Sequence, residues 1–168
     1  MTRTRMLVAM PLLLLGQLVL VAVGVYPQLS ARAVGDELRL RVEPVDPIDP
    51  FRGAYVTLDY PDLRRNDSSG FEGGQGSMED GEAGTVFVAL RPEGDVWVAH
   101  DWTRERPEDG TYLRCDDRDW QIRCGIESWF LPQEDAKAME EAVAGGTAVA
   151  TVKVDGRGNT ALVGVSAP

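Results

Sequence analysis

The chain has 168 residues, which is enough for one domain with its own hydrophobic core, and its formal net charge is −10. Such an acidic protein is not expected to bind nucleic acid, because phosphate binding requires a basic surface. Only Lys137 and Lys153 are lysines. The composition therefore offers little material for lysine-based catalysis.

The N-terminal segment predicts a transmembrane anchor. Arg3 and Arg5 lie in residues 1–5, and residues 6–26 carry no formal charge. A helix over residues 6–26 spans roughly 31 Å at about 1.5 Å per residue, which matches the hydrocarbon core of a bilayer. Because the arginines precede the apolar run, we expect residues 1–5 in the cytoplasm and residues 34–168 as a domain outside it, periplasmic or at the cell surface.

A cleaved signal peptide is the alternative for this segment. Ala31 and Ala33 have the spacing of a cleavage site, which would lie after Ala33. The apolar run is longer than the usual signal-peptide core of about 7–15 residues, and the candidate site lies well beyond its end. We therefore favour an uncleaved anchor, with the lipid bilayer as the partner of residues 6–26.

Alternating apolar residues predict strands after the anchor. Leu38, Leu40 and Val42 alternate with charged residues, which is typical of a half-buried strand. A corner containing three prolines follows, and residues 54–60 then alternate again. The face expected to be buried comprises Ala54, Val56, Leu58 and Tyr60.

The remaining segments predict hairpins, one loop and one helix. Residues 66–84 are rich in Gly, Ser and acidic residues and predict a long flexible loop, and residues 85–102 predict a hairpin around RPEG. Pro132 to Gly145 has the pattern of a short helix, and the chain closes with a second hairpin around DGRGN. We expect a mainly β, antiparallel sandwich or barrel-like domain with one short helix, preceded by the transmembrane helix.

Cys115 and Cys124 are the only cysteines, and both fall in the part expected to be exported. Disulfides persist outside the cytoplasm, so we predict a disulfide that joins the segments TYLRC and QIRCGIE. Closing so short a loop stabilises a fold by about 2–3 kcal/mol. Two cysteines without a nearby histidine are a poor metal site, and we expect no metal or cofactor.

The sequence predicts no catalytic residue. Ser77-Met78 resembles the nucleophile of signal-peptidase-type serine–lysine enzymes, but it lies in a Gly-rich acidic loop, and Lys153 is expected to point outward from a strand. His100 stands alone at a strand end, without a poised serine nearby. We read it as an ordinary, partly exposed histidine.

Two aspartates in the proline-rich corner allow two interpretations. Asp46 and Asp49, with Arg52 just beyond, have the spacing of an acid–base pair or a cation site. Aspartate before proline is also a turn former, with Arg52 as a natural ion-pair partner. If Asp46, Asp49 and Glu127 converged in one pocket, they would favour a carboxylate-dependent hydrolase of the cell envelope.

Two stretches of the sequence resemble a known family. GAYVTLDY, residues 53–60, resembles the motif that names the GDYXXLXY family of bacterial membrane-anchored proteins, and EPVDP and FRG before it are similar to the family's usual lead-in. GIESWFLP, residues 125–132, resembles a second family signature. Ala54 stands where the family name has Asp, which removes a tempting catalytic acid from this chain.

The resemblance implies a domain of unknown function that is often associated with multi-pass membrane proteins. We therefore expect a binding or accessory module at the membrane, with a multi-pass membrane protein or an envelope component as its partner. Besides Asp46 and Asp49, the residues expected to form a shared surface or a core junction are Arg52, Gly53, Tyr55, Leu58, Tyr60, Gly125, Glu127, Trp129 and Phe130.

Overall fold

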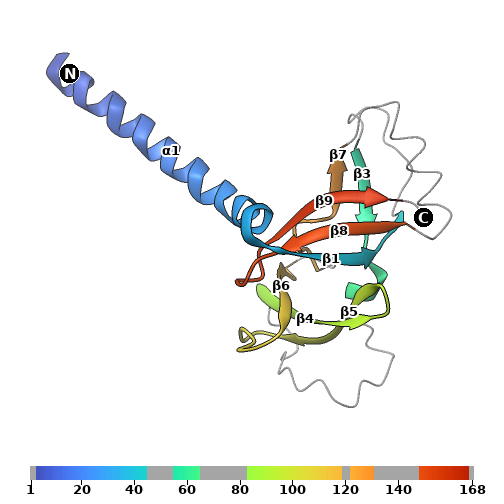
Figure 1. Ribbon diagram of the computed structural model, residues 1–168. Helices are drawn as coiled ribbons and strands as arrows, with labels where there is room; N and C mark the ends of the chain where they lie inside the picture. The colour runs from blue at the N-terminus through green and yellow to red at the C-terminus, as the bar shows by residue number, and fades with distance from the viewer. Residues whose placement is uncertain (1–2, 45–54, 65–82, 119–121, 131–147, 167–168) are drawn as a thin grey trace.

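The computed structural model describes residues 3–44, 55–64, 83–118, 122–130 and 148–166. A long N-terminal helix leads into three small antiparallel sheets, which confirms the mainly β fold and the helix before it (Figure 1). The sheets do not close into a barrel. The helix predicted over residues 132–145 and nearly all of the loop predicted over 66–84 lie outside the described residues.

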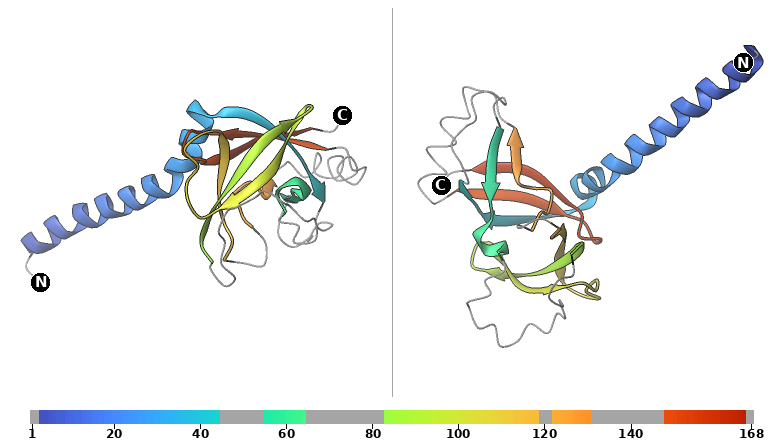
Figure 2. Two further views of the ribbon diagram at one scale, coloured as in Figure 1. Left: turned by 90° about the horizontal axis from the view of Figure 1, so that it is seen from below. Right: turned by 180° about the vertical axis from the view of Figure 1, so that it is seen from behind.

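The helix α1 (Arg3–Val34) is apolar on all sides along most of its length. Its stretch Met10–Val34 is long and apolar enough to cross a membrane. The sequence predicted such a segment over residues 6–26, and the helix continues eight residues further. Leu18 and Leu20 are 68% and 73% exposed, so the domain does not cover them. The helix projects away from the sheets in every view (Figure 2).

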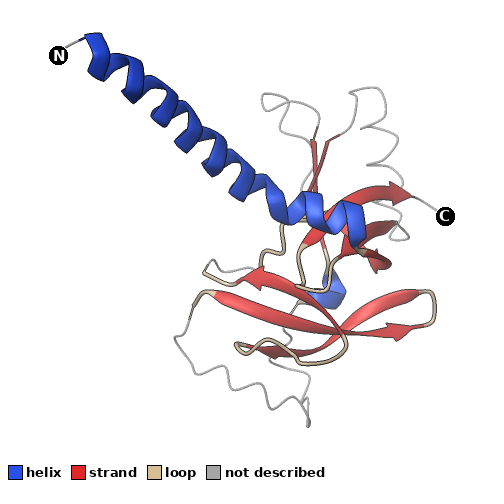
Figure 3. Ribbon diagram, turned by 60° about the vertical axis from the view of Figure 1, so that its left-hand side comes forward, coloured by secondary structure: helices blue, strands red, loops and turns tan. Residues whose placement is uncertain are grey.

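The last turn of α1, in contrast, is joined to the domain. Ala31 is fully buried, and the Ser30 hydroxyl donates a hydrogen bond of 2.6 Å to Oδ2 of Asp155. Arg32 Nη2 donates to the carbonyl oxygen of Leu162 at 3.2 Å, and Lys153 Nζ donates to the carbonyl oxygen of Arg32 at 3.3 Å. The end of α1 therefore rests on the sheet that contains these residues (Figure 3).

That sheet has the strand order β1-β8-β9, formed by β1 (Asp36–Arg41), β8 (Val149–Val154) and β9 (Thr160–Ser166). The predicted alternation in β1 is confirmed, because Leu38 and Leu40 are buried while their charged neighbours are exposed. The predicted closing hairpin is β8–β9. Strand β8 lies in the middle, which places the last hairpin beside the first strand of the domain.

The second sheet has the order β5-β4-β6, formed by β4 (Thr85–Glu93), β5 (Val96–Thr103) and β6 (Thr111–Asp116). The predicted hairpin over residues 85–102 is confirmed. Its turn is narrower than RPEG, because the strand runs to Glu93 and pairs it with Val96. Proline is tolerated at position 92 because β6 pairs with β4 only as far as Leu90.

The third sheet, β2-β3-β7, is formed by β2 (Glu43–Pro44), β3 (Tyr55–Asp59) and β7 (Ser128–Phe130). A 3-10 turn, η1 (Pro61–Leu63), follows β3. Val42 connects this sheet to the first one, since its amide donates to the carbonyl oxygen of Ala148 at 3.1 Å.

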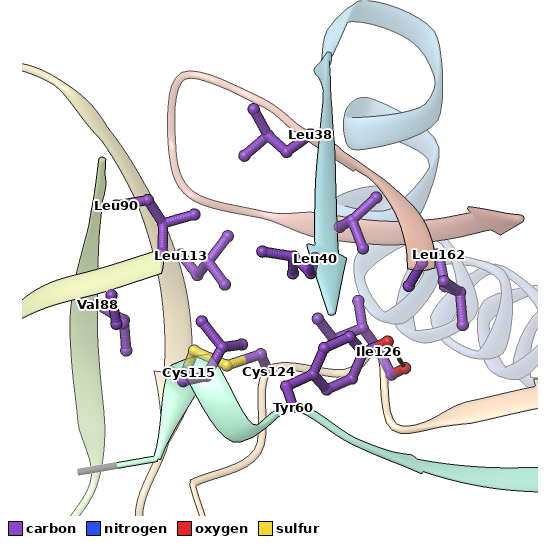
Figure 4. Close-up of a cluster of buried hydrophobic side chains, with 14 of the residues drawn as sticks. Leu38, Leu40, Tyr60, Val88, Leu90, Leu113, Cys115, Cys124, Ile126 and Leu162 are labelled. Carbon is purple, nitrogen blue, oxygen red and sulfur yellow. Dashed lines mark hydrogen bonds between the residues drawn. A yellow bond between two sulfur atoms is a disulfide. The ribbon is translucent and has the colours of Figure 1, made fainter. Parts of the chain in front are cut away.

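One hydrophobic core joins all three sheets (Figure 4). The two larger sheets lie one above the other in Figure 1 and face each other with aliphatic side chains, as in a sandwich. The third sheet contributes Leu58, and the chain just after β3 contributes Tyr60. The most completely buried large side chains are Leu40, Leu58, Leu113, Ile126, Val42, Val86, Val88 and Val152.

Candidate functional site

The structure places the two sequence motifs side by side. Strand β3, from the GAYVTLDY motif, pairs antiparallel with β7, from the GIESWFLP motif. Tyr55 lies opposite Phe130 in this ladder, and Thr57 lies opposite Ser128. The amide of Leu58 continues the pairing, since it donates to the carbonyl oxygen of Glu127 at 2.8 Å.

Tyr60 fixes the end of this junction inside the core. Its side chain is 4% exposed, and its hydroxyl donates a hydrogen bond of 2.8 Å to the carbonyl oxygen of Ile126 (Figure 4). Burial, and secondarily the negative charge of Glu127, raise the pKa of Tyr60 far above its ordinary value. The phenol is therefore a neutral structural donor at physiological pH.

Glu127 turns its carboxylate toward the backbone of its own loop. The carboxylate accepts hydrogen bonds from the amides of Cys124 and Gly125, the latter at 3.0 Å to Oε2. Gly125 has a φ of +78°, a conformation that suits glycine, and this lets both amides point at one carboxylate. Glu127 thus stabilises the tight loop that enters β7, and its lone pairs are largely committed there.

The predicted disulfide between Cys115 and Cys124 is present, with an S–S distance of 2.00 Å. It links the end of β6 to the loop that Glu127 organises, and the carbonyl oxygen of Cys124 accepts a hydrogen bond from the Thr160 hydroxyl. The predicted strand pair around the cysteines is shorter than expected. Among the described residues it consists of one bridge, in which Asp116, the last residue of β6, and Arg123 exchange two backbone hydrogen bonds of 2.7 Å.

Several residues singled out in the sequence cannot be placed at this junction. Asp46, Asp49, Arg52 and Gly53 lie outside the described residues, as does Ser77. For Tyr55 and Phe130, only the backbone is described. Trp129 is half-buried and packs against the core. The convergence of Asp46 and Asp49 with Glu127 is thus not tested.

Within the described part of the chain, the side chains singled out as candidates make structural contacts and are not arranged for catalysis. No cluster of three or more histidine, cysteine or acidic residues is arranged there to hold a metal ion. Lys153 is half-buried, and its amino group is bonded to the carbonyl oxygen of Arg32 rather than to a serine hydroxyl. His100 is the extra residue of a bulge between β4 and β5, and its buried Nδ1 has no hydrogen-bond partner among these residues.

One contact, between α1 and the last hairpin, escaped sequence reasoning. Asp155, read as a turn residue in the DGRGN hairpin, also receives the Ser30 hydrogen bond from α1. Burial alone would raise the pKa of Asp155, but this bond and those from the Asn159 side chain and the Arg157 and Asn159 amides outweigh burial and lower the pKa. No local pattern signals a bond between residues 125 positions apart.

The comparisons with known proteins identify a family. The family model described as GDYXXLXY protein matches residues 17–165, which is most of the chain. No curated protein and no solved structure matches the chain significantly. The matched range begins inside α1 and ends in β9, so it covers the second half of the helix, both motifs and nearly all of the closing hairpin. The chain therefore belongs to the GDYXXLXY family, a family of unknown function.

Proposed function

We propose that the chain is a single-pass membrane protein with a non-catalytic accessory domain. In this proposal α1 crosses the cytoplasmic membrane with its N-terminus inside, and the β-rich domain is held at the outer face. There it binds a multi-pass membrane protein or an envelope component. The family match names neither a location nor a partner, so the proposal is argued from the helix and its attachment.

The observation that carries the proposal is the way in which α1 is attached. Its apolar side chains are exposed over most of its length, which is costly in water and favourable in a bilayer. Its last turn is hydrogen-bonded to β8, to β9 and to the turn between them. A helix built into the domain in this way suits a permanent anchor that holds one face of the domain toward the membrane.

The proposed orientation rests on the charges at the N-terminal end of the chain. Arg3 and Arg5 precede the apolar segment, and positively charged flanks remain on the cytoplasmic side. A periplasmic-active reporter fused after Pro168 should therefore be active, and a cytoplasm-active reporter at the same position should be inactive. The opposite pair of results would overturn the proposed orientation.

The accessory role is tested by site-specific photo-crosslinking in intact cells. A photo-reactive residue would replace Arg91, Glu93, Arg118 or Arg157 in turn, because all four side chains are exposed on the domain. We expect one membrane or envelope protein to be captured from some of these positions and not from the others. Position dependence matters, since a bound partner covers only part of the surface.

A matched control carries the same residue at Leu13, which is exposed on α1 and should meet lipid. Reciprocal capture, with the probe in the partner, should recover this chain. Equal yields from all positions, or no membrane or envelope protein from any, would contradict the accessory role.

The hydrolase alternative has no comparable support among the described residues. The carboxylate of Glu127 is bonded to two backbone amides, which leaves it poorly placed to activate a water molecule. The binding module is therefore the function we propose.

A further inference from the structure

A cleft lies between α1 and the domain, beside the disulfide. Its volume is about 350 Å³. Gly24, Pro27 and Gln28 of α1 line one side, and Arg114 and Arg123 line the other. Neither sequence motif contains these arginines, although Gly125 of the second motif also lines the cleft.

The depth of this cleft relative to a bilayer follows from the apolar run. The continuous apolar run ends at Tyr26, where Pro27 and Gln28 follow, and the hydrocarbon core occupies about 20 helical residues. Gly24 lies two residues before that end, and Gln28 lies two residues after it. If α1 spans the membrane, the cleft opens at the level of the lipid headgroups.

Arginines outnumber acidic residues among the described residues that line the cleft, although the chain as a whole is acidic. The side chains of Arg114 and Arg123 are exposed, and Asp116 is the acidic residue that lines the cleft with them. The Asp116 carboxylate is already engaged by Arg118, through its amide at 3.0 Å and its guanidinium at 3.6 Å. Among the described residues, the cleft is thus lined by two arginines and by one carboxylate that Arg118 engages.

We propose that this cleft binds the phosphate of an anionic phospholipid headgroup. Arginine presents a planar fork of donors that suits phosphate oxygens, and basic pockets beside membrane helices recognise anionic headgroups. The cleft adjoins α1, so a lipid could keep its acyl chains beside the helix while its phosphate reaches Arg114 and Arg123. The proposal rests on the proposed function in one respect, namely that α1 is inserted in a membrane.

The test uses the full chain in uncharged detergent micelles, titrated with phosphatidylglycerol and observed by native mass spectrometry. The variant Arg114→Gln/Arg123→Gln should bind phosphatidylglycerol about tenfold more weakly, because each arginine contributes charge-assisted hydrogen bonds to phosphate. The control Arg39→Gln/Arg91→Gln removes the same charge from exposed positions on β1 and β4, and should bind like the unaltered chain. Phosphatidylcholine should bind the unaltered chain more weakly than phosphatidylglycerol.

Two further measurements guard against misfolding and against a soluble ligand. Phosphatidylglycerol with a photo-reactive headgroup, added to the unaltered chain, should label peptides that contain Arg114 or Arg123. Inorganic phosphate should compete only weakly, since it lacks the acyl chains. Competition as strong as that of the lipid would overturn the lipid as ligand in favour of free phosphate.

Equal phosphatidylglycerol binding by the double variant and the unaltered chain would overturn the site, as would equal loss in the Arg39/Arg91 control. Labelling confined to other peptides would have the same consequence. Carbonate extraction of cell membranes tests separately whether the chain is integral to the membrane, as the proposed function requires. If the chain stays in the membrane but the arginines do not matter, only the lipid site is wrong.

Discussion

At the scale of single residues, Gly158 shows how little room the turn between β8 and β9 has. Its φ is +76°, and its carbonyl oxygen accepts a hydrogen bond of 2.8 Å from the amide of Arg114 in β6. A Cβ atom at this position would lie 2.7 Å from Cε2 of Tyr112 and 2.9 Å from the amide nitrogen of Arg114. The turn therefore touches the second sheet at a point where only glycine fits.

We expect Gly158→Ala to lower the free energy of unfolding by about 2–4 kcal/mol, because the left-handed backbone and the contact with Tyr112 both oppose a side chain. Guanidinium unfolding of the full chain in micelles measures this change. Gly156→Ala is the matched control, since Gly156 lies in the same turn with open space around it. Equal effects of the two substitutions would show that the close approach at Gly158 is unimportant.

Asp117, which follows β6 directly, is hydrogen-bonded to both a side chain and a backbone amide. Its carboxylate accepts two hydrogen bonds from Arg104, at 2.9 and 2.6 Å, and a third from the amide of Gly84 at 2.7 Å. Both side chains of the ion pair are largely buried, at 17% and 13% exposure for Arg104 and Asp117. The Arg104 hydrogen bonds lower the pKa of Asp117, against the opposing effect of burial.

Because the folded pKa of Asp117 is depressed, its stabilising effect is present above the unfolded pKa of about 3.9 and is lost as the pH falls through the folded pKa. We expect Asp117→Asn to lower the free energy of unfolding by about 1–3 kcal/mol at pH 7. The difference from the unaltered chain should shrink below about pH 4. Unfolding curves recorded from pH 7 to pH 2 measure it.

Asp95→Asn serves as the control for this series, since Asp95 is exposed in the turn between β4 and β5. A difference between Asp117→Asn and the unaltered chain that stays constant down to pH 2 would contradict the ion-pair explanation.

At the scale of elements, the family motifs act as parts of one junction. Strand β3 pairs with β7, and the Tyr60 hydroxyl and the Glu127 carboxylate secure the chain on either side of that pairing. The disulfide then ties the loop before β7 to the end of β6. In the described part of the chain, β3 and β7 share three paired positions, so these additional contacts help to hold the third sheet to the larger sheets.

We expect Cys115→Ser/Cys124→Ser to lower the free energy of unfolding by about 2–3 kcal/mol, because the bond restricts a short loop of the unfolded chain. The comparison of unfolding with and without a reducing agent should give a similar loss for the unaltered chain. The double variant should not respond to the reducing agent. A stability that is insensitive to reduction in the unaltered chain would contradict this role.

At the scale of the whole molecule, the joint between α1 and the domain determines how the domain is oriented relative to the helix. Gly35 passes so close to β8 that a Cβ atom there would lie 2.9 Å from the backbone of Val154 and would clash with the carbonyl oxygen of Ala31. Ser30, Ala31 and Arg32 then complete the joint through burial and hydrogen bonds. Residues that a signal peptidase would remove are therefore part of the domain's packing.

We expect the mature protein to keep residues 1–33, because their loss would uncover β8 and leave Asp155 without its Ser30 donor. Intact mass spectrometry of the protein purified from membranes measures this directly. Ser30→Ala should also increase hydrogen exchange at residues 31–35, whereas Ser166→Ala, at the exposed end of β9, should not. A mature N-terminus at Val34 would overturn the uncleaved anchor.

Local patterns in the sequence predicted much of the fold. Alternation marked Leu38 and Leu40 as buried, turn residues marked both hairpins, and the two cysteines implied their disulfide. These predictions succeed because side-chain periodicity and turn conformation depend on neighbouring residues. The same reasoning predicted too wide a turn for the first hairpin, because it placed Pro92 in the turn rather than in β4. Whether a strand can include Pro92 depends on where its neighbour β6 ends, which local sequence does not show.

The candidate site was less predictable, because its contacts join distant parts of the chain. The sequence by itself determined a helix that is long and apolar enough to cross a membrane, a β-rich domain and membership of a family. Three contacts were decided only by the tertiary structure. The Tyr60 hydroxyl donates a hydrogen bond to the carbonyl oxygen of Ile126, and the Ser30 hydroxyl donates one to the carboxylate of Asp155. Gly158 packs so closely against Tyr112 that a side chain has no room there. Each of these contacts forms when separate sheets and the helix pack on one core, and no local pattern of residues encodes that packing.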